Sequence, residues 1–267
     1  MAVLMFLAID NLELAFEGVK ALDGVSLEVP EGSLTAVIGP NGAGKTSLFN
    51  CISGVYKPTS GRVRLKGETI AGGTSGEFAA HEIAARGVAR MFQNLALFDQ
   101  MTVLDNMLLG RHHRYETSWF HDILWFGKTA RQEVAHRQKV EEIIDFLHLE
   151  RFRKTPVGIL PYGILKRVEL GRALCMEPDL LLLDEPAAGL NQEETEDMAR
   201  YMLDIKEELG ITQILIEHEL HFVLDLADNI AVLDFGCKIA EGSAEQIRQE
   251  PAVIEAYVGV GHAEGRP

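Results

Sequence analysis

The segment GPNGAGKTS, Gly39–Ser47, constrains the fold of this chain more than any other feature of its sequence. An apolar run that begins at Leu34 precedes it and predicts a buried strand, and apolar residues at helical spacing follow it from Leu48 to Val55. In a glycine-rich loop between a strand and a helix, backbone N–H groups and the helix N-terminus together attract an anion. The sequence therefore predicts an α/β core that binds a phosphate-bearing ligand.

Different residues of this loop are expected to bind different parts of a nucleotide. Glycines let the backbone approach a phosphate without a Cβ clash. The Lys45 ammonium is expected to reach the β- and γ-phosphates, and the Thr46 hydroxyl to hold Mg²⁺. We expect the ATP-binding residues of this loop to be Gly39, Pro40, Asn41, Gly42, Ala43, Gly44, Lys45, Thr46 and Ser47.

A second motif, LLLLDE, covers Leu180–Glu185. A continuous aliphatic run of this length favours a parallel strand buried on both faces. Ligands of parallel sheets bind beyond the carboxyl ends of the strands, so Asp184 and Glu185 would face the nucleotide. We expect Asp184 to hold the metal through water and Glu185 to orient or deprotonate the attacking water. The alternative is an acidic pair that only caps the following helix.

Three further residues are weaker candidates when each is taken alone. His218 follows the predicted strand ITQILIE, where an imidazole can contact a γ-phosphate, although it can also be a surface residue. The amide oxygen of Gln93 is a candidate Mg²⁺ ligand, and otherwise Gln93 is an ordinary polar loop residue. Phe16 is able to stack on adenine, or else it packs in the core.

The pattern changes between residues 94 and 175, where strand signals give way to helical ones. We interpret 94–175 as a helical subdomain inserted into a nucleotide-binding core made of 1–93 and 176–267, within one domain of 1–267. Beyond the insertion, Asn191 and Glu194 predict a capping box for the next helix. Phe235-Gly236 predicts a turn between two strands.

Composition excludes several classes of protein. The formal net charge is −15, so the chain lacks the basic field that nucleic-acid binding requires. Its 3 cysteines include no CxxC, which argues against a disulfide framework or a zinc site. The start, MAVLMFLAID, lacks the features of a signal peptide, and no apolar run reaches about 18 residues. A role at a membrane would thus require a partner.

The order of these motifs along the whole chain resembles that of the ATP-binding subunits of ABC transporters. The resemblance rests on Phe16, GPNGAGKT, Gln93, LPYGI, LLLLDEP, AAGLN and His218. It implies a P-loop NTPase (RecA-like) core with an N-terminal antiparallel β subdomain and an inserted α-helical subdomain. It also implies that two such subunits pair head to tail, and that each ATP lies between one phosphate loop and the partner's signature motif.

The signature motif of this chain departs from the family's LSGGQ pattern. It consists of Leu160, Pro161, Tyr162, Gly163 and Ile164. Pro161 stands where the family has a serine and lacks both a hydroxyl and an N–H group. Ile164 stands in place of a glutamine, and Asn191 where the family often has aspartate. We expect a weaker but functional ATP sandwich, since Gly163 and the following helix N-terminus still offer N–H groups.

A closer resemblance is to the larger ATPase of branched-chain amino acid importers. It rests on RMFQNLALFDQMTVLDNMLLG, LLDEPAAGLNQEE, ILIEHEL and the tail KIAEGSAEQIRQEPAVIEAYVG, with an insertion from Arg111 to about Lys139. The aromatic residues of that insertion indicate either local packing or a surface for a membrane partner; they are Trp119, Phe120, Trp125 and Phe126.

The resemblance implies a mechanism, partners and a location. Lys45, Glu185 and His218 would be catalytic, and Mg²⁺ would be held by Thr46, Gln93 and, through water, Asp184. The implied partners are a second ATPase subunit, two permease subunits and, indirectly, a substrate-binding protein, on the cytoplasmic face of the plasma membrane. The alternatives are the ATPase of a lipid or lipopolysaccharide exporter and a soluble ABC protein of translation or DNA repair. The net charge of −15 and the single phosphate loop argue against the soluble class.

Overall fold

The computed structural model describes residues 5–73, 78–93, 95–112, 128–218 and 220–261. Contacts divide the chain into two compact units. The first consists of Met1–Arg90, Leu180–Glu185 and Met202–Pro267, and the second of Met91–Asp179 and Pro186–Tyr201. The aromatic residues predicted in the insertion lie outside the described residues.

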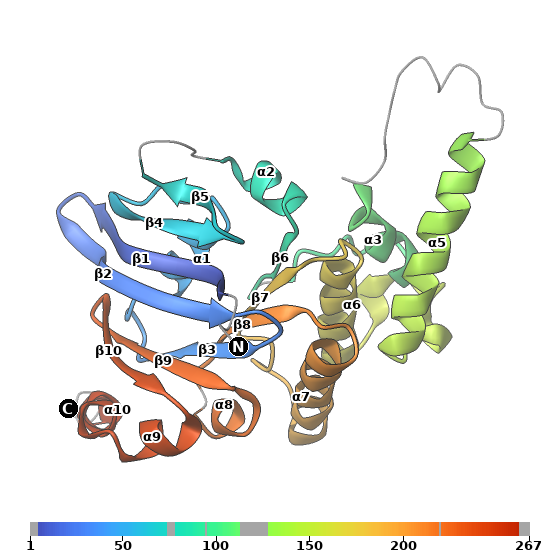
Figure 1. Ribbon diagram of the computed structural model, residues 1–267. Coiled ribbons are helices and arrows are strands. Elements are labelled where there is room, and N and C mark those ends of the chain that lie inside the picture. The colour runs from blue at the N-terminus through green and yellow to red at the C-terminus, as the bar shows by residue number, and fades with distance from the viewer. Residues whose placement is uncertain (1–4, 74–77, 94, 113–127, 219, 262–267) are drawn as a thin grey trace. The chain divides into compact units, whose positions relative to one another are not determined.

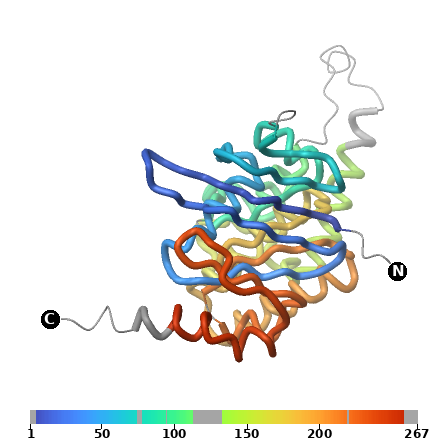
Figure 2. Tube along the Cα trace, turned by 60° about the vertical axis from the view of Figure 1, so that its left-hand side comes forward, coloured from blue at the N-terminus to red at the C-terminus, as the bar shows by residue number. Residues whose placement is uncertain are grey.

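The first unit contains a four-stranded antiparallel sheet with the strand order β2-β1-β4-β5. Its strands are β1 (Met5–Phe16), β2 (Val19–Pro30), β4 (Ser60–Leu65) and β5 (Glu68–Gly72). β1 and β2 form a long hairpin, visible at the blue end of the tube in Figure 2. Glu17 and Gly18 both have positive φ, 47° and 92°, which is the geometry of a tight hairpin turn.

A second sheet of six strands has the order β10-β9-β3-β8-β7-β6. Its strands are β3 (Leu34–Ile38), β6 (Val88–Met91), β7 (Leu180–Asp184), β8 (Thr212–Ile216), β9 (Asn229–Asp234) and β10 (Cys237–Gly242). β3 is parallel to both β8 and β9, and β7 is parallel to β8. β9 and β10 form an antiparallel pair around Phe235 and Gly236, which confirms the predicted turn.

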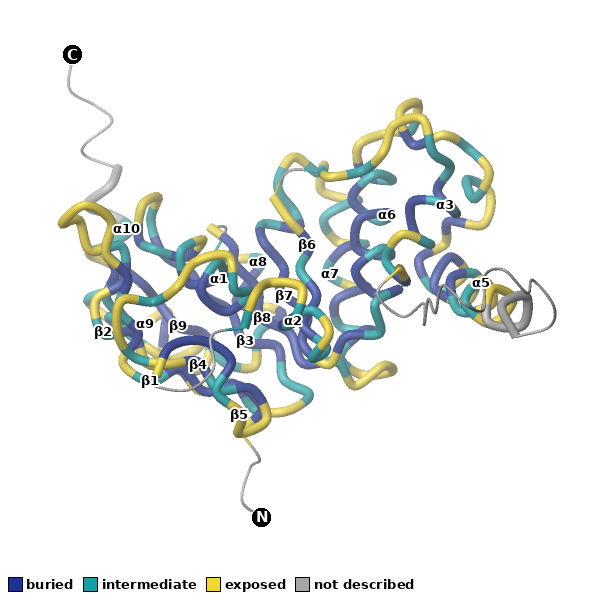
Figure 3. The backbone as a smooth tube through the Cα atoms, turned by 90° about the horizontal axis from the view of Figure 1, so that it is seen from above, coloured by how far each residue is buried: buried dark blue, intermediate teal, exposed yellow. Residues whose placement is uncertain are grey.

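The core of the first unit joins both sheets. Every residue of β3, β7 and β8 is buried, as expected for central parallel strands, and Figure 3 shows these strands in dark blue. The helix α1 (Lys45–Ile52) contributes Leu48, Phe49, Cys51 and Ile52 to a cluster with apolar side chains of both sheets. The other helices are α2 (Ala80–Ala85), α8 (Leu220–Leu226), α9 (Ala244–Gln249) and α10 (Pro251–Gly261), labelled in Figure 1.

The second unit is built from helices. They are α3 (Val103–Leu109), α5 (Lys128–Phe146), α6 (Tyr162–Leu174) and most of α7 (Gln192–Glu207), with short 3₁₀ turns at Glu150–Phe152 and Val157–Ile159. α7 begins with the predicted capping box, because the Glu194 N–H donates to Asn191 Oδ1 at 3.0 Å and the Asn191 N–H donates to Glu194 Oε2 at 3.1 Å.

Part of the chain that we assigned to the nucleotide-binding core groups instead with these helices. Pro186–Tyr201 belongs to the second unit by its contacts. The Arg167 guanidinium of α6 donates to Asp197 Oδ2 at 2.6 Å and to Tyr201 Oη at 3.2 Å, which ties this stretch to the helices. The division into 1–93 with 176–267 and a lobe of 94–175 therefore remains a prediction.

Two helices end before apolar residues that continue their helical spacing. α1 ends at Ile52, so Val55 lies beyond it and is half exposed, and Gly54 has a φ of 73°. α7 ends at Glu207, which leaves Leu209 partly exposed and outside its buried face. In the described ranges, no helix combines the length and the apolar character that crossing a membrane requires.

Candidate nucleotide-binding site

The phosphate loop continues directly from the buried strand β3 into α1. Its three glycines all have positive φ, at 149° for Gly39, 83° for Gly42 and 102° for Gly44. A Cβ on Gly39 would lie 2.0 Å from the Leu233 carbonyl oxygen, and one on Gly44 would lie 2.5 Å from the Ala21 carbonyl oxygen. These two glycines are thus required by packing behind the loop, whereas Gly42 has open space around it.

The Lys45 ammonium lies inside the loop. Lys45 is 7% exposed, and its Nζ donates to the carbonyl oxygens of Gly39 at 2.6 Å and Pro40 at 3.0 Å. Burial lowers the pKa of Lys45, while the carboxylates of Glu185 and Asp184 act in the opposite direction. Two neutral carbonyl groups compensate a buried cation only partly, so an anionic phosphate would bind this ammonium more strongly than they do.

The acidic pair stands at the end of β7 in the same unit as the loop. Asp184 is buried and Glu185 has a φ of 49°, a conformation that is uncommon outside glycine. The Glu185 N–H donates to the Ile216 carbonyl oxygen at 2.9 Å, which anchors the residue to β8. His218 Nδ1 lies 3.9 Å from Glu185 Oε1, so the structure brings together two residues predicted to be catalytic.

Sequence reasoning missed two charged residues at this place. Arg90 of β6 donates to Asp184 Oδ2 at 2.6 Å and to Asn50 Oδ1 of α1 at 2.7 Å. Glu217 is 1% exposed, and its Oε2 lies 3.8 Å from His218 Nδ1. Glu217 directly follows β8, and Arg90 is the next-to-last residue of β6, in the same sheet as Asp184. Their place near the carboxyl ends of strands was the signal that could have identified them.

The oxygen donors here suit Mg²⁺. Magnesium prefers oxygen ligands and usually binds through one or two protein groups, with phosphate oxygens and water completing its shell. The described residues contain no cluster of three or more His, Cys, Asp or Glu side chains that could hold a metal by themselves. Within the first unit, a Thr46 hydroxyl and an Asp184 carboxylate acting through water fit an ion that also binds nucleotide phosphates.

The aromatic candidate for adenine stacking lies at the end of β1. Phe16 is 45% exposed, and its ring meets the ring of Tyr56 edge-on with the centroids 5.1 Å apart. An edge contact occupies one side of the Phe16 ring and is compatible with stacking of a base on its face. The role of Phe16 stays a prediction.

Gln93 and the signature motif belong to the second unit. The Lys166 ammonium of α6 donates to the Gln93 carbonyl oxygen at 3.4 Å. Pro161 occupies the N-cap position of α6 without a side-chain hydrogen bond, and helical bonding starts with the Ile164 and Leu165 N–H groups, both of which donate to the Pro161 oxygen. The first N–H groups of a helix have no partner within it, so those of Tyr162 and Gly163 can face an anion.

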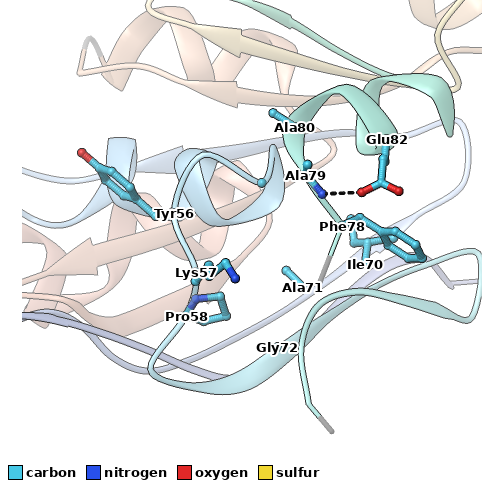
Figure 4. A pocket seen from close by; sticks show the side chains of 11 residues that line it. Tyr56, Lys57, Pro58, Ile70, Ala71, Gly72, Phe78, Ala79, Ala80 and Glu82 are labelled. Atoms are coloured by element: carbon cyan, nitrogen blue, oxygen red, sulfur yellow. Dashed lines mark hydrogen bonds between the residues drawn. The ribbon is translucent and has the colours of Figure 1, made fainter. Parts of the chain in front are cut away.

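Two cavities of the first unit differ in their relation to these residues. One of about 270 Å³, shown in Figure 4, is lined by residues from Gly54 to Pro58, from β5 and from the start of α2, and it contains none of the predicted site residues. Another of about 560 Å³ is bordered by Pro40, Asn41, Gly42 and Ala43 of the phosphate loop and by Phe235. The second cavity thus adjoins the loop that we expect to bind phosphate.

Comparisons with known proteins agree with this geometry. The family model described as "ABC transporter" matches residues 22–188, and the model described as "Branched-chain amino acid ATP-binding cassette transporter" matches residues 237–263. The chain is 39% identical to the high-affinity branched-chain amino acid transport ATP-binding protein BraF of Pseudomonas aeruginosa, over 95% of this chain and 97% of the relative. It is 35% identical to the corresponding protein LivG of Escherichia coli, with the same coverage.

Solved structures show the same similarity. A nucleotide-free ATP-binding cassette from an ABC transporter matches with a TM-score of 0.81 and 34% identity, covering 95% of this chain and 98% of the other. An ATP-binding cassette of an ABC transporter in its ADP conformation matches with a TM-score of 0.82 and 34% identity, covering 96% and 99%. The expected fold class is confirmed by these matches.

Proposed function

This chain belongs to the ABC transporter family, and from that membership we propose that it is the subunit that hydrolyses ATP to power import of branched-chain amino acids. The observation that carries the proposal is the arrangement within the first unit. The buried Lys45 ammonium in its phosphate loop shares this unit with the acidic pair Asp184 and Glu185 and with His218.

The proposed mechanism begins when ATP enters the phosphate loop. The γ-phosphate draws the Lys45 ammonium away from the carbonyl oxygens of Gly39 and Pro40, and the loop N–H groups bind the remaining phosphate oxygens. Mg²⁺, held by Thr46, Gln93 and, through water, Asp184, would neutralise charge on the phosphates when bound. Phe16 holds the adenine by stacking.

Hydrolysis itself is assigned to Glu185 and His218. Glu185 accepts a proton from the attacking water or orients it in line with the leaving oxygen. His218 lies beside Glu185 and is placed to donate to the γ-phosphate as negative charge builds there. Arg90 donates to both Asp184 and Asn50, and so fixes the position of the end of β7 relative to α1.

The proposed assembly contains two ATPase subunits and two membrane-spanning permease subunits, served by a substrate-binding protein outside the membrane. The signature residues Leu160–Ile164 would complete the ATP site of the second ATPase subunit. ATP favours the closed pair only through the contacts that exist in that state. The chain would lie at the cytoplasmic face of the membrane, attached through the permeases.

Reconstitution of the transporter tests this function. The chain is co-purified with its permease subunits, placed in proteoliposomes with ATP inside, and supplied with radiolabelled leucine and the substrate-binding protein. We expect ATP-dependent leucine uptake that Lys45→Met abolishes and that the exposed control Glu208→Gln leaves unchanged. Uptake that persists in Lys45→Met, or ATP-driven extrusion of a lipid with no leucine uptake, would refute the proposal.

A further inference from the structure

The helix that follows the signature motif carries three charged side chains on one face. Lys166, Glu169 and Arg172 are spaced three residues apart along α6, so they share a side of the helix. Lys166 and Glu169 are almost fully buried, with 0% and 1% exposure, and the Arg172 side chain is 19% exposed. Burial of three charged side chains destabilises the fold unless ion pairs and hydrogen bonds offset their loss of hydration.

All three side chains interact with backbone groups in the stretch of chain that carries Gln93. The Lys166 ammonium donates to the Gln93 carbonyl oxygen at 3.4 Å, and the Arg172 guanidinium donates to the Ala96 carbonyl oxygen. The N–H groups of Phe92 and Ala96 face the Glu169 carboxylate closely enough to favour its charged form. The stripe therefore contacts backbone groups on both sides of Gln93.

The polar contacts of the buried Glu169 carboxylate are long. Neither of its oxygens has a hydrogen bond of ordinary geometry, and Arg172 Nη2 lies 3.9 Å from Oε1. Burial raises the pKa of Glu169 to about 7, against the influence of Lys166 and Arg172. Among the residues that the structure describes, the titratable groups that face Glu169 all belong to α6: they are Lys166, Arg172 and Tyr162, and Glu169 helps to raise the pKa of Tyr162. The stretch around Gln93 contributes backbone groups.

We propose that Glu169 is a positioning residue that, together with Lys166 and Arg172, fixes the backbone around Gln93 to the signature helix. Gln93 and the motif Leu160–Ile164 would then move as one body when nucleotide binds. This inference rests on the proposed functions of Gln93 and of the signature motif. Glu169 itself would touch neither nucleotide nor metal.

Hydrogen–deuterium exchange on the full-length chain tests the proposal. Glu169→Gln preserves the shape of the side chain and removes its charge, so we expect exchange at Phe92 and Ala96 to speed up about tenfold. Arg172→Leu, which removes the donor to the Ala96 oxygen, should have the same local effect. The control is Glu141→Gln, which makes the same chemical change in an ion pair with Arg153 of the same unit and should leave both amides unchanged.

Three outcomes are informative. Faster exchange confined to the chain around Gln93 in both variants would support the proposal. Unchanged exchange there, or equal acceleration throughout the second unit, would overturn it, the latter because it would indicate only a general loss of stability. A separate Gln93→Ala variant whose Mg²⁺ dependence of ATP hydrolysis matches the wild type would refute the role of Gln93 as a ligand, while the exchange rates alone decide the role of Glu169.

Discussion

At the scale of single residues, the chemistry assigned to this chain depends most on Glu185. Its positive φ of 49° and its anchored N–H hold the carboxylate beyond the end of β7. Strained backbone of this kind persists where the surrounding structure enforces it, often at functional sites.

Replacement of Glu185 by glutamine should separate ATP binding from hydrolysis. The amide retains the size of the carboxylate but cannot accept the proton of water, so we expect turnover to fall by roughly a hundredfold or more while ATP still binds. Phosphate release and fluorescent-ATP titration measure the two properties. Near-normal turnover in Glu185→Gln would remove this residue from the mechanism.

A second prediction for single residues concerns the contribution of the Arg90–Asp184 ion pair to stability. Their side chains are 7% and 4% exposed, so removal of the guanidinium in Arg90→Met leaves a buried carboxylate without its cation. We expect a loss of about 3–5 kcal/mol in the free energy of unfolding, measured with urea. The exposed pair of Arg62 with Asp10 is the control, and Arg62→Met should cost less than about 1 kcal/mol.

The pKa of Glu169 predicts an unusual dependence of stability on pH. Because burial raises this pKa to about 7, the folded chain binds a proton between pH 4.5 and 7 that the unfolded chain has released. Stability therefore falls as pH rises through that window, by up to about 3 kcal/mol from this group. Urea unfolding should show a weaker pH dependence in Glu169→Gln, and an identical dependence would contradict this interpretation.

At the scale of elements, the start of α6 is where this chain departs most from its family's pattern. Pro161 occupies the N-cap without providing a side-chain hydrogen bond. A serine there adds a hydroxyl acceptor for the first turn and an N–H group, so Pro161→Ser should stabilise the helix by roughly 1 kcal/mol. We also expect stronger ATP-driven dimerisation, measured by light scattering. Unchanged dimerisation and hydrolysis in Pro161→Ser would show that the proline does not weaken the ATP sandwich.

The elements were predictable where a local pattern determines them. β3, the phosphate loop and α1 follow from an apolar run, three glycines and helical spacing, and the β9–β10 turn follows from Phe235-Gly236. The apolar spacing continues to Val55, whereas α1 ends at Ile52 and the left-handed Gly54 turns the chain before Val55. Local periodicity does not record such a break.

Contacts between distant segments could not be predicted in the same way. Arg90 and Asp184 meet because β6 and β7 belong to one sheet, which neither residue's neighbours in the sequence reveal. Glu169 lies in a helical pattern that would suit an exposed charge, yet it is 1% exposed. The order of the motifs was enough to predict the family. The partners of the buried charges could be identified only from the structure.

At the scale of the whole molecule, the proposed ATPase cycle depends on a phosphate loop, an acidic strand end and a signature helix. The first two belong to one compact unit and the signature helix to the other. The resemblance to ABC transporter subunits implies that each ATP contacts the phosphate loop of one subunit and the signature motif of a second subunit. In a pair of such subunits, nucleotides would therefore contact both kinds of unit. The central claim is that the phosphate loop binds the triphosphate through Lys45.

The most direct test is a crystal structure of Glu185→Gln grown with ATP and Mg²⁺. We predict a γ-phosphate in contact with the Lys45 ammonium, which would no longer donate to the carbonyl oxygens of Gly39 and Pro40 as it does here at 2.6 and 3.0 Å. A structure in which ATP binds elsewhere, with Lys45 still bonded to its own loop, would contradict it.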